Sequence, residues 1–411
     1  MQPQTIFYII LAIIVFNFLL ERLLAYLNQR NWCPELPNEL EAFYDAAAYA
    51  KSQKYHKEKN RLALWSETLG FVILVVFLCL GGFGRTSIWL RQFIDDPIFL
   101  ALAYFGLLSF AGSVIQLPFS LYNTFVIEEK YGFNRTTVRT YIADKIKGLA
   151  LTLVIGGALG YLVLWLILSI GENFWLYAWV LFACIMLFIN LFYTSLIVPI
   201  FNKLSPLEDG SLRQKIEAYA RRVNFPLTNI MVLDGSKRSS KANAFFSGIG
   251  SSKKIVLYDT LIQKHTEDEV VAVLAHEVGH YKKKHIIKGL ILGLLQTGFT
   301  LWLLLQFVFN ESLSLALGEN SWQLHVNLLA FSTLYEPISV ILSLLMNVLS
   351  RKHEYEADTY AAQTADKQAF SQALIRLSTD TLSNLKPHPA YVFFHYSHPT
   401  LLQRLRNLNR H

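Results

Sequence analysis

Cysteines and charged residues are scarce in this chain of 411 residues. Its three cysteines, Cys33, Cys79 and Cys184, lie far apart and form no CxxC pair, which excludes a disulfide framework and a cysteine-based zinc site. Only 16% of the residues are charged, whereas 53% are apolar. The net charge of +7 is modest for this length and no nucleic-acid recognition motif accompanies it, so we expect no nucleic-acid partner.

Apolar runs long enough to cross a bilayer recur along the chain, since a span needs about 20 residues. The first run is followed by Glu21-Arg22 and has neither a basic start nor a cleavage site, which indicates a retained helix and not a signal peptide. Pro118 is expected to break or kink the third run. The sequence therefore predicts a mainly α-helical, polytopic membrane protein. Its seven expected spans are 5–27, 68–84, 97–127, 148–171, 173–202, 289–310 and about 323–350.

Lysine and arginine are distributed unevenly among the connections between these spans. The connections after the first, third and fifth spans and the C-terminal tail are basic. Those after the fourth and sixth spans contain no Lys or Arg, and the one after the second contains only Arg85 and Arg91. The positive-inside rule then places the basic connections and the C-terminus in the cytoplasm. The N-terminus is expected outside, as an odd number of spans requires.

Polar residues also occur at the expected depth of the membrane. Glu336 lies in the middle of the seventh run, His325 lies near its start and Gln116 lies in the third. An ionisable group at this depth is costly and usually faces a partner or an internal cavity. We therefore expect a water-accessible interior, although a misplaced span boundary is an alternative explanation for His325.

The segment His276-Glu277-Val278-Gly279-His280 directly precedes the sixth span. Thr266 and Glu269 form an expected capping box, which predicts a helix through this segment. Residues four apart share a helix face, so both imidazoles would point the same way beside the Glu277 carboxylate. This is the HExxH pattern of zinc peptidases. The alternative is a surface helix with solvated histidines.

A third metal ligand is expected in residues 350–358, directly after the seventh span, because a catalytic zinc usually takes three protein ligands and a water. Glu354 and Asp358 are four apart, so one could bind the metal while the other accepts a hydrogen bond from a ligand histidine. His353 and Glu356 are rival ligands, and spacing alone does not choose among the four. The alternative for this stretch is a charged juxtamembrane helix.

Six segments together resemble the type I CAAX prenyl endopeptidase family, integral-membrane zinc metallopeptidases of the endoplasmic reticulum with bacterial relatives. The resemblance implies seven transmembrane helices around a large water-filled chamber, capped from the cytoplasmic side by an α+β zinc metallopeptidase domain. The segments, in the family's order, are 128–137 (EEKYGFNRTT), 199–207 (PIFNKLSPL), 236–248 (SKRSSKANAFFSG), 272–281 (AVLAHEVGHY), 351–358 (RKHEYEAD) and 397–405 (SHPTLLQRL).

The resemblance also assigns roles at the site. It implies one zinc ion per chain, Asp358 as a supporting acid, and His398 and Arg404 near the metal. Glu277 would act as the base, and His398 or Arg404 would stabilise the oxyanion. The implied zinc ligands are His276, His280 and Glu354, and the implied edge for the substrate backbone is Asn243, Ala244 and Phe245.

Four blocks are expected along the chain: 1–202 with spans one to five, 203–288 and 351–411 as two parts of the peptidase domain, and 289–350 with spans six and seven. Within the second block, 229–233 and 254–258 are strand-like. The expected activity is hydrolysis of a peptide, C-terminal to a prenylated Cys. A bacterial origin is expected, with residence in the inner membrane, or in the endoplasmic reticulum for a eukaryotic source. The alternatives are a quality-control protease with no prenyl requirement and a lipid or solute carrier with a structural metal.

Overall fold

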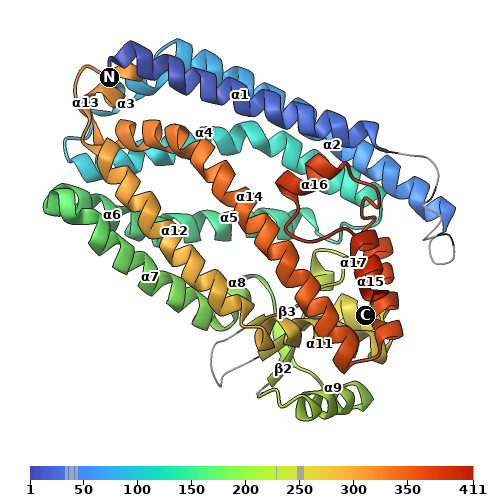
Figure 1. The fold of residues 1–411 in the computed structure, drawn as a ribbon. Helices are drawn as coiled ribbons and strands as arrows, with labels where there is room; N and C mark the ends of the chain where they lie inside the picture. Colours follow the sequence, from blue (N-terminus) through green and yellow to red (C-terminus); the bar gives the residue numbers. More distant parts are fainter. Residues whose placement is uncertain (33–35, 37–40, 42–44, 228, 248–253, 411) are drawn as a thin grey trace.

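The computed structural model describes every residue except 33–35, 37–40, 42–44, 228, 248–253 and 411 (Figure 1). Cys33 and Gly248, the last residue of segment 236–248, therefore lie outside the described residues. Long helices occupy one end of the molecule, and a small sheet with its own helices occupies the other (Figure 1). This division sets the metal-binding motif at the boundary between an apolar and a polar part of the fold.

Six described helical segments are long and apolar enough to cross a membrane. The helix that contains Pro118 does not end there and continues as a π-helix, η2, over Asn123–Glu128. Five of the six segments correspond to single long helices. These are α1 (Pro3–Arg30), α2 (Ala46–Cys79), α4 (Pro97–Tyr122), α12 (His285–Val308) and α14 (Leu324–Thr364).

The sixth segment, Val138–Phe201, accounts for two of the seven expected spans. Its 64 residues would extend about 96 Å as one straight helix, roughly three times the hydrocarbon thickness. The chain instead turns at Gly171, where φ is +66°, a conformation that costs glycine little. The outgoing half contains α5 (Val138–Leu151) and α6 (Gly157–Ile170), and the returning half contains α7 (Phe174–Phe192) and α8 (Val198–Phe201). Because α6 packs on α7, the segment is a hairpin, so the described residues contain seven apolar helical stretches where seven spans were expected.

The membrane helices bury little of their surface against one another. Only 11–22% of the residues in their apolar windows are buried, which indicates a wall one helix thick with two exposed faces. Glu336 and Gln116 are both exposed, and Gln116 accepts a hydrogen bond from Ser66 (2.8 Å). His325 is buried in the first turn of α14, where it bonds to Ser87 (2.7 Å). The expected water-accessible interior therefore stays a prediction that rests on these two exposed polar groups, while His325 lies in the first turn of its helix.

At the far end of the membrane region two short helices close the connections, α3 (Gly82–Leu90) and α13 (Glu311–Ala316). Their backbones meet where the amide of Gly84 donates to the carbonyl of Leu317 (2.9 Å). A side chain at Gly84 would collide with Gly318, so this close approach requires glycine. The end of the molecule opposite the sheet is thereby tied together.

The sheet has four described strands in the order β1-β2-β4-β3. The two predicted strands, β2 (Asn229–Leu233) and β4 (Lys254–Tyr258), have the expected bounds and pair in parallel at its centre. Their continuous apolar runs, Ile-Met-Val-Leu in β2 and Ile-Val-Leu-Tyr in β4, explain their position, because central strands are covered on both faces. The outer strands, β1 (Leu204–Pro206) and β3 (Ala244–Ser247), pair antiparallel with β2 and β4.

One apolar core joins this sheet to the C-terminal residues of the chain. It includes Ile255 and Leu257 of β4, Leu274 of the HExxH helix and Phe370 from the C-terminal part. Segments 203–288 and 351–411 are therefore packed into one α+β unit although two membrane helices separate them in sequence. The helices of this unit are α9 (Ser211–Arg222), α10 (Asp259–Lys264), α11 (Glu267–Lys282), α15 (Lys367–Asp380), α16 (Pro389–His395) and α17 (Leu401–Leu408).

Candidate active site

The helix α11 begins as the capping box predicts. The hydroxyl of Thr266 accepts from the amide of Glu269 (3.3 Å), and the Glu269 carboxylate accepts from the amide of Thr266 (3.1 Å). The helix then carries His276 and His280 on one face, with their Nε2 atoms 3.1 Å apart. The predicted pair of imidazoles is thus formed within the folded chain.

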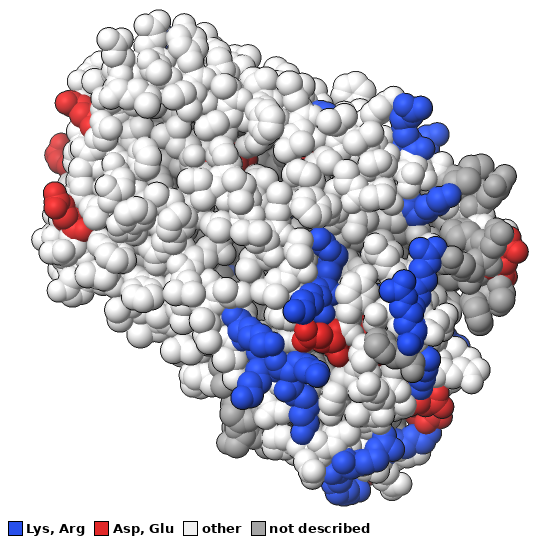
Figure 2. Space-filling view, viewed as in Figure 1, with Lys and Arg blue, Asp and Glu red and all other residues white. Residues whose placement is uncertain are grey.

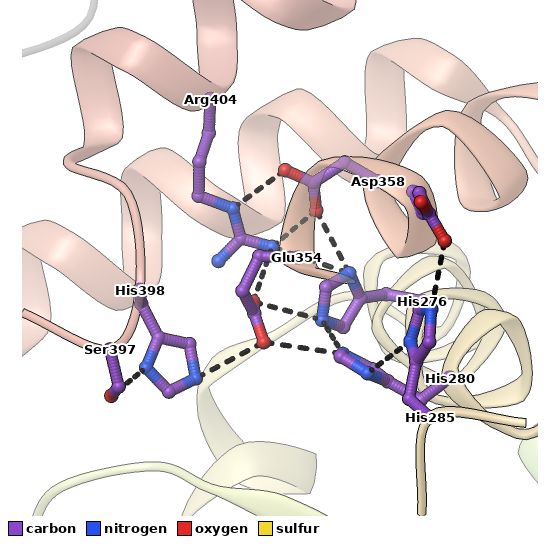
Figure 3. A network of polar contacts seen from close by, with 9 residues as sticks. His276, His280, His285, Glu354, Asp358, Ser397, His398 and Arg404 are labelled. Carbon is purple, nitrogen blue, oxygen red and sulfur yellow. Dashed lines mark hydrogen bonds and ion pairs between the residues drawn. The ribbon is translucent and has the colours of Figure 1, made fainter. Parts of the chain in front are cut away.

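Gly279 allows α14 to lie directly against this helix. A Cβ atom at position 279 would be 3.0 Å from Cα and 3.1 Å from the carbonyl oxygen of Ala357, closer than ordinary van der Waals contact. The two backbones can approach this closely only because residue 279 has no side chain. Their approach brings Glu354, one turn before Ala357 on α14, to the two histidines (Figure 3).

The Nε2 atoms of His276 and His280 and the carboxylate of Glu354 form a group that could hold a metal ion (Figure 3). Glu354 Oε2 is 3.4 Å from Nε2 of His276, and Oε1 is 3.3 Å from Nε2 of His280. Ligand atoms at 2.0–2.1 Å from a tetrahedral zinc would be separated by about 3.3 Å. The three separations of 3.1, 3.4 and 3.3 Å therefore fit the coordination shell of one ion.

Asp358 supports the first histidine. Its Oδ1 is 2.8 Å from Nδ1 of His276, so Nδ1–H donates there and leaves Nε2 free for a metal. Arg404 donates to both oxygens of Asp358 in a forked pair. Burial alone would lower the pKa of His276, but the carboxylates of Asp358 and Glu354 outweigh it and raise that pKa to about 9.

A second chain of hydrogen bonds supports His280, and the sequence did not predict it. His285 Nε2 is 3.0 Å from Oε2 of Glu356, and its Nδ1 is 3.1 Å from Nδ1 of His280. Since the Glu356 carboxylate only accepts, His285 Nε2 carries the proton and His285 Nδ1 accepts from Nδ1–H of His280. The Nε2 atom of His280 is again left free for a metal.

The two rival ligands are accounted for by this second chain. Glu356 bonds to His285, and His353 stacks on the ring of His285 with the centroids 3.9 Å apart. Lys284 precedes His285 with φ +58°, a left-handed turn between α11 and α12 that returns the chain toward His280. A positive φ at lysine is not visible in the sequence, which is why spacing alone did not reveal the role of His285.

Glu277 lies on the wall of an apolar cavity of about 430 Å³ beside the metal-binding group. Burial raises the pKa of Glu277 above the ordinary carboxyl value. Asn243, Ala244 and Phe245 line the same cavity. Ala244 and Phe245 belong to β3, and Asn243 directly precedes it. Because β3 is the outermost strand of the sheet, one of its edges has no partner among the described strands.

His398 reaches the metal-binding group from the C-terminal side (Figure 3). Its Nε2 is 3.3 Å from Oε1 of Glu354, and its side chain is 64% exposed. It shares the cavity with Arg404, whose side chain is only 15% exposed and is held by Asp358. All ten residues predicted for the site are thus brought to one region, and their individual roles remain predictions.

A helical membrane region joined to an α+β unit that carries a His-Glu-x-x-His helix and a third carboxylate defines a membrane-embedded metallopeptidase. Residues 22–203 match the family "CAAX prenyl protease N-terminal, five membrane helices", and residues 206–411 match "Peptidase family M48". The chain belongs to this M48 family of CAAX prenyl protease-like metalloendopeptidases.

Named relatives align with nearly the whole chain. CAAX prenyl protease 1 of Saccharomyces cerevisiae is 35% identical over 403 residues, which cover 91% of this chain and 88% of the relative. The homologue of Homo sapiens is 31% identical, with 97% and 94% covered. The crystal structure of S. mikatae Ste24p superposes with a TM-score of 0.93 at 34% identity, over 98% of this chain and 99% of that one.

Proposed function

We propose that this protein is a zinc endopeptidase of the membrane that hydrolyses the peptide bond C-terminal to a prenylated Cys. One observation carries the proposal: a His, His, Glu ligand group and an unliganded carboxylate, Glu277, face the same apolar cavity. The names of the relatives, CAAX prenyl protease 1 and its homologues, support the prenylated substrate.

His276, His280 and Glu354 would hold one zinc ion per chain. Two imidazoles and one carboxylate are a donor set of catalytic zinc sites, which leave one position open. The chemistry that the ion supplies is Lewis acidity, which polarises a carbonyl and makes water acidic near neutral pH. The supporting acid Asp358 fixes the tautomer of His276 and is itself held by Arg404.

Glu277 would take the proton from the attacking water and pass it to the leaving amine. A general base works best when its pKa is close to the working pH, and burial moves the pKa of Glu277 in that direction. No hydrogen bond to the metal-binding group is required of it, because its task is proton transfer at the substrate.

His398 is the better candidate for stabilising the oxyanion. Its side chain is exposed in the cavity, whereas Arg404 is committed to Asp358 through two hydrogen bonds. A donor aimed at the developing negative charge is worth several kcal/mol in such sites. Arg404 would then act as a positioning residue through Asp358.

The free edge of β3 would bind the substrate as an added strand. Main-chain groups of Asn243, Ala244 and Phe245 would pair with an extended peptide and lead it past Glu277. The apolar part of the cavity lining, which includes Phe246 and Phe370, suits the apolar groups of such a substrate.

The distribution of charge supports a cytoplasmic active site. Figure 2 shows lysine and arginine gathered toward the end of the molecule that carries the sheet, with some acidic side chains among them, whereas the opposite end shows only acidic side chains. By the positive-inside rule, the peptidase domain, formed by 203–288 and 351–411, and the C-terminus would face the cytoplasm and the N-terminus would face outward. The membrane itself stays a prediction, the bacterial inner membrane or, for a eukaryotic source, the endoplasmic reticulum.

The test of the chemistry is Glu277→Gln in the full chain. We expect this variant to retain about one zinc per chain and to lose hydrolysis by a factor of at least about 10². His276→Ala and Glu354→Ala should instead lose the zinc. Full activity in the Gln variant would overturn the assignment of the base. Zinc binding without any peptidase activity in the unmodified chain would instead favour a carrier with a structural metal.

The substrate is tested by comparing a farnesylated CAAX peptide with the same peptide left unmodified. Preferential cleavage of the farnesylated peptide is the expected outcome. Equal cleavage of both would favour the alternative, a quality-control protease that acts on membrane proteins without a prenyl requirement.

A further inference from the structure

A second, larger cavity of about 840 Å³ adjoins the apolar cavity of the metal site. The two cavities share five lining residues and therefore lie directly side by side. These five, which form the wall between them, are Asn243, Leu374, Leu377, His398 and Arg404. A peptide that passes Glu277 along β3 would enter the second cavity with the residues that follow the cleaved bond.

The two cavities differ in chemical character. The apolar cavity contains Glu277 and Glu354, whereas the described lining of the larger one contains no carboxylate. Its charged side chains are Lys59 and Arg404, and its remaining titratable lining is imidazole and tyrosine. A ligand that fills this cavity meets only positive charge and neutral groups.

Lys59 carries a positive charge that its own surroundings do not balance. It is 3.2 Å from Oε1 of Glu128, but Lys241 is also 3.1 Å from Oε2 of the same carboxylate. Two ammonium groups thus share one carboxylate, which also accepts from the hydroxyl of Tyr55 (2.6 Å). The cluster has a net charge of +1, and Lys59, 39% exposed, is the member of the lysine pair that lines the cavity.

Neighbouring carboxylates form no ion pair with Lys59 among the described residues. Glu58, one residue before Lys59, pairs with Lys130, and the exposed Glu129 accepts from the side chain of Asn134 and forms no ion pair with Lys59 or Lys241. A half-buried unbalanced ammonium is costly unless an anion approaches it. The excess charge therefore points to an anionic ligand in the larger cavity.

Helix α15 runs beside both cavities, so positions along it give a measure of length within them. Phe370 stacks on the ligand His276 with ring centroids 5.8 Å apart, and eight residues later Ser378 lines the larger cavity. At 1.5 Å per residue, these positions are about 12 Å apart along the helix. The chain just beyond α15 then contacts α2, where His56 bonds to the carbonyl of Leu382 (2.7 Å), one turn from Lys59.

A peptide tail of three residues is about as long as the stretch of α15 between Phe370 and Ser378. In extended form three residues span about 10 Å. A CAAX substrate cut after its prenylated Cys has three residues beyond the cleaved bond and ends in a free carboxylate. That carboxylate would lie in the larger cavity, whose lining includes Lys59.

We propose that Lys59 binds the C-terminal carboxylate of the peptide substrate and so selects tails of three residues. This inference rests on the proposed function. A lipid phosphate is another anion that a membrane protein meets, but the position of the cavity directly beside the metal-binding group favours the peptide.

The experiment compares three farnesylated peptides that differ only after the Cys: a three-residue tail with a free carboxylate, the same tail amidated, and the acid lengthened by two residues. The full-length enzyme should cleave the free acid about 10- to 100-fold better in kcat/KM than the amide, because a charge-assisted hydrogen bond is lost. We expect the lengthened acid to be cleaved with a kcat/KM as low as that of the amide. We expect most of each difference to appear in KM.

Lys59→Gln should remove this preference while leaving cleavage of the amidated peptide as it is in the unmodified enzyme. Lys59→Arg should retain the preference. Lys57→Gln is the matched control, since Lys57 is an exposed lysine of the same helix that does not line the cavity. Cleavage of the amide serves as the measure of correct folding in every variant.

Three outcomes would overturn the subsite: equal cleavage of acid and amide by the unmodified enzyme, an unchanged preference in Lys59→Gln, or loss of amide cleavage in that variant. So would a dependence on Lys59 that appears only when nanodiscs of phosphatidylglycerol replace phosphatidylcholine, because that result assigns the charge to a lipid headgroup. No cleavage of any prenylated peptide by the unmodified enzyme would overturn the proposed function, and the subsite with it.

Discussion

At the scale of single residues, the two ligand histidines are prepared for a metal by different partners. His276 donates to a carboxylate, Asp358, whereas His280 donates to another imidazole, His285. In both cases the Nδ1 proton is used and Nε2 faces Glu354. The hydrogen bonds therefore fix the same tautomer at both positions. Groups that surround metal ligands commonly set the ligand tautomer in this way.

The raised pKa of His276 predicts that zinc binding releases a proton at neutral pH. The pKa of about 9 lies above the ordinary histidine value of 6.5, so the ion-free site is protonated at His276 below pH 9. Zinc must displace that proton, so apparent zinc affinity should fall about tenfold for each pH unit below 9. Titration calorimetry of chelator-treated protein in two buffers of different ionisation enthalpy measures the release.

Glu277→Gln provides the control for this titration, because it should bind zinc with the same proton release. An apparent affinity that did not change between pH 6.5 and 8.5 would contradict the raised pKa of His276.

Removal of His285 should weaken zinc binding without removing a ligand. His285→Ala leaves Nδ1–H of His280 without its acceptor, so we expect about a 10- to 100-fold loss of zinc affinity. Glu356→Gln should produce a smaller loss in the same direction, because His285 can still accept. Competition with a zinc-binding dye gives both values.

The double variant separates support from general destabilisation. If His285 and Glu356 act as one chain, the two losses of affinity will not add. Additive losses, or a zinc affinity that His285→Ala leaves unchanged, would show that His280 is oriented by other contacts.

At the scale of elements, the site depends on how closely α11 and α14 approach one another. Glu354 lies on a helix that begins in the membrane region and ends in the peptidase unit. The HExxH helix reaches it only because Gly279 faces Ala357 without a side chain. The Gly in this motif therefore acts in packing, while the histidines on either side of it are the predicted metal ligands.

Gly279→Ala should separate the two helices and weaken the metal site. The added methyl group would meet backbone atoms of Ala357 at 3.0–3.1 Å, and forcing such an atom into a packed contact costs about 1–3 kcal/mol. We expect a lower melting temperature in detergent and reduced zinc content. Gly289→Ala in α12 is the matched control, since nothing lies within 4 Å of the added atom and the substitution should be neutral or slightly stabilising.

Elements with strong periodicity or long apolar runs were predictable from the sequence, and short or context-dependent ones were not. The membrane helices and the apolar strands β2 and β4 were predicted. β1 and β3 were not, because three or four residues, with Pro206 in one of them, are too few to show a period. Pro118 did not end α4, since a helix in the membrane can accommodate a proline with help from its surroundings.

The candidate site was predictable where residues four apart share a helix face, and the resemblance supplied the choice of Glu354 among its rivals. The contact of His285 with His280 was not predictable, because the two are five positions apart and belong to two helices joined by the left-handed Lys284. Tertiary contacts through a single unusual dihedral angle leave no periodic signal in the sequence.

At the scale of the whole molecule, charge is sorted along the axis that runs from the membrane helices to the sheet. Lysine and arginine gather toward the end with the peptidase unit, where some acidic side chains accompany them, and the opposite end shows acidic side chains only (Figure 2). Between them lies a wide region of uncharged surface, which suits a bilayer. This sorting underlies the prediction that the basic end faces the cytoplasm.

Cysteine labelling tests the orientation, in a chain whose three native cysteines are changed to serine. Lys57→Cys introduces a thiol at an exposed position in the polar half of α2, and Glu172→Cys introduces one at the exposed turn between α6 and α7. An impermeant maleimide should label position 172 in sealed vesicles that expose the outer face and position 57 in those that expose the cytoplasmic face, because the positive-inside rule puts the basic connections inside. Retained hydrolysis shows that each variant is folded, and the opposite pattern of labelling would place the metal site on the outer side of the membrane.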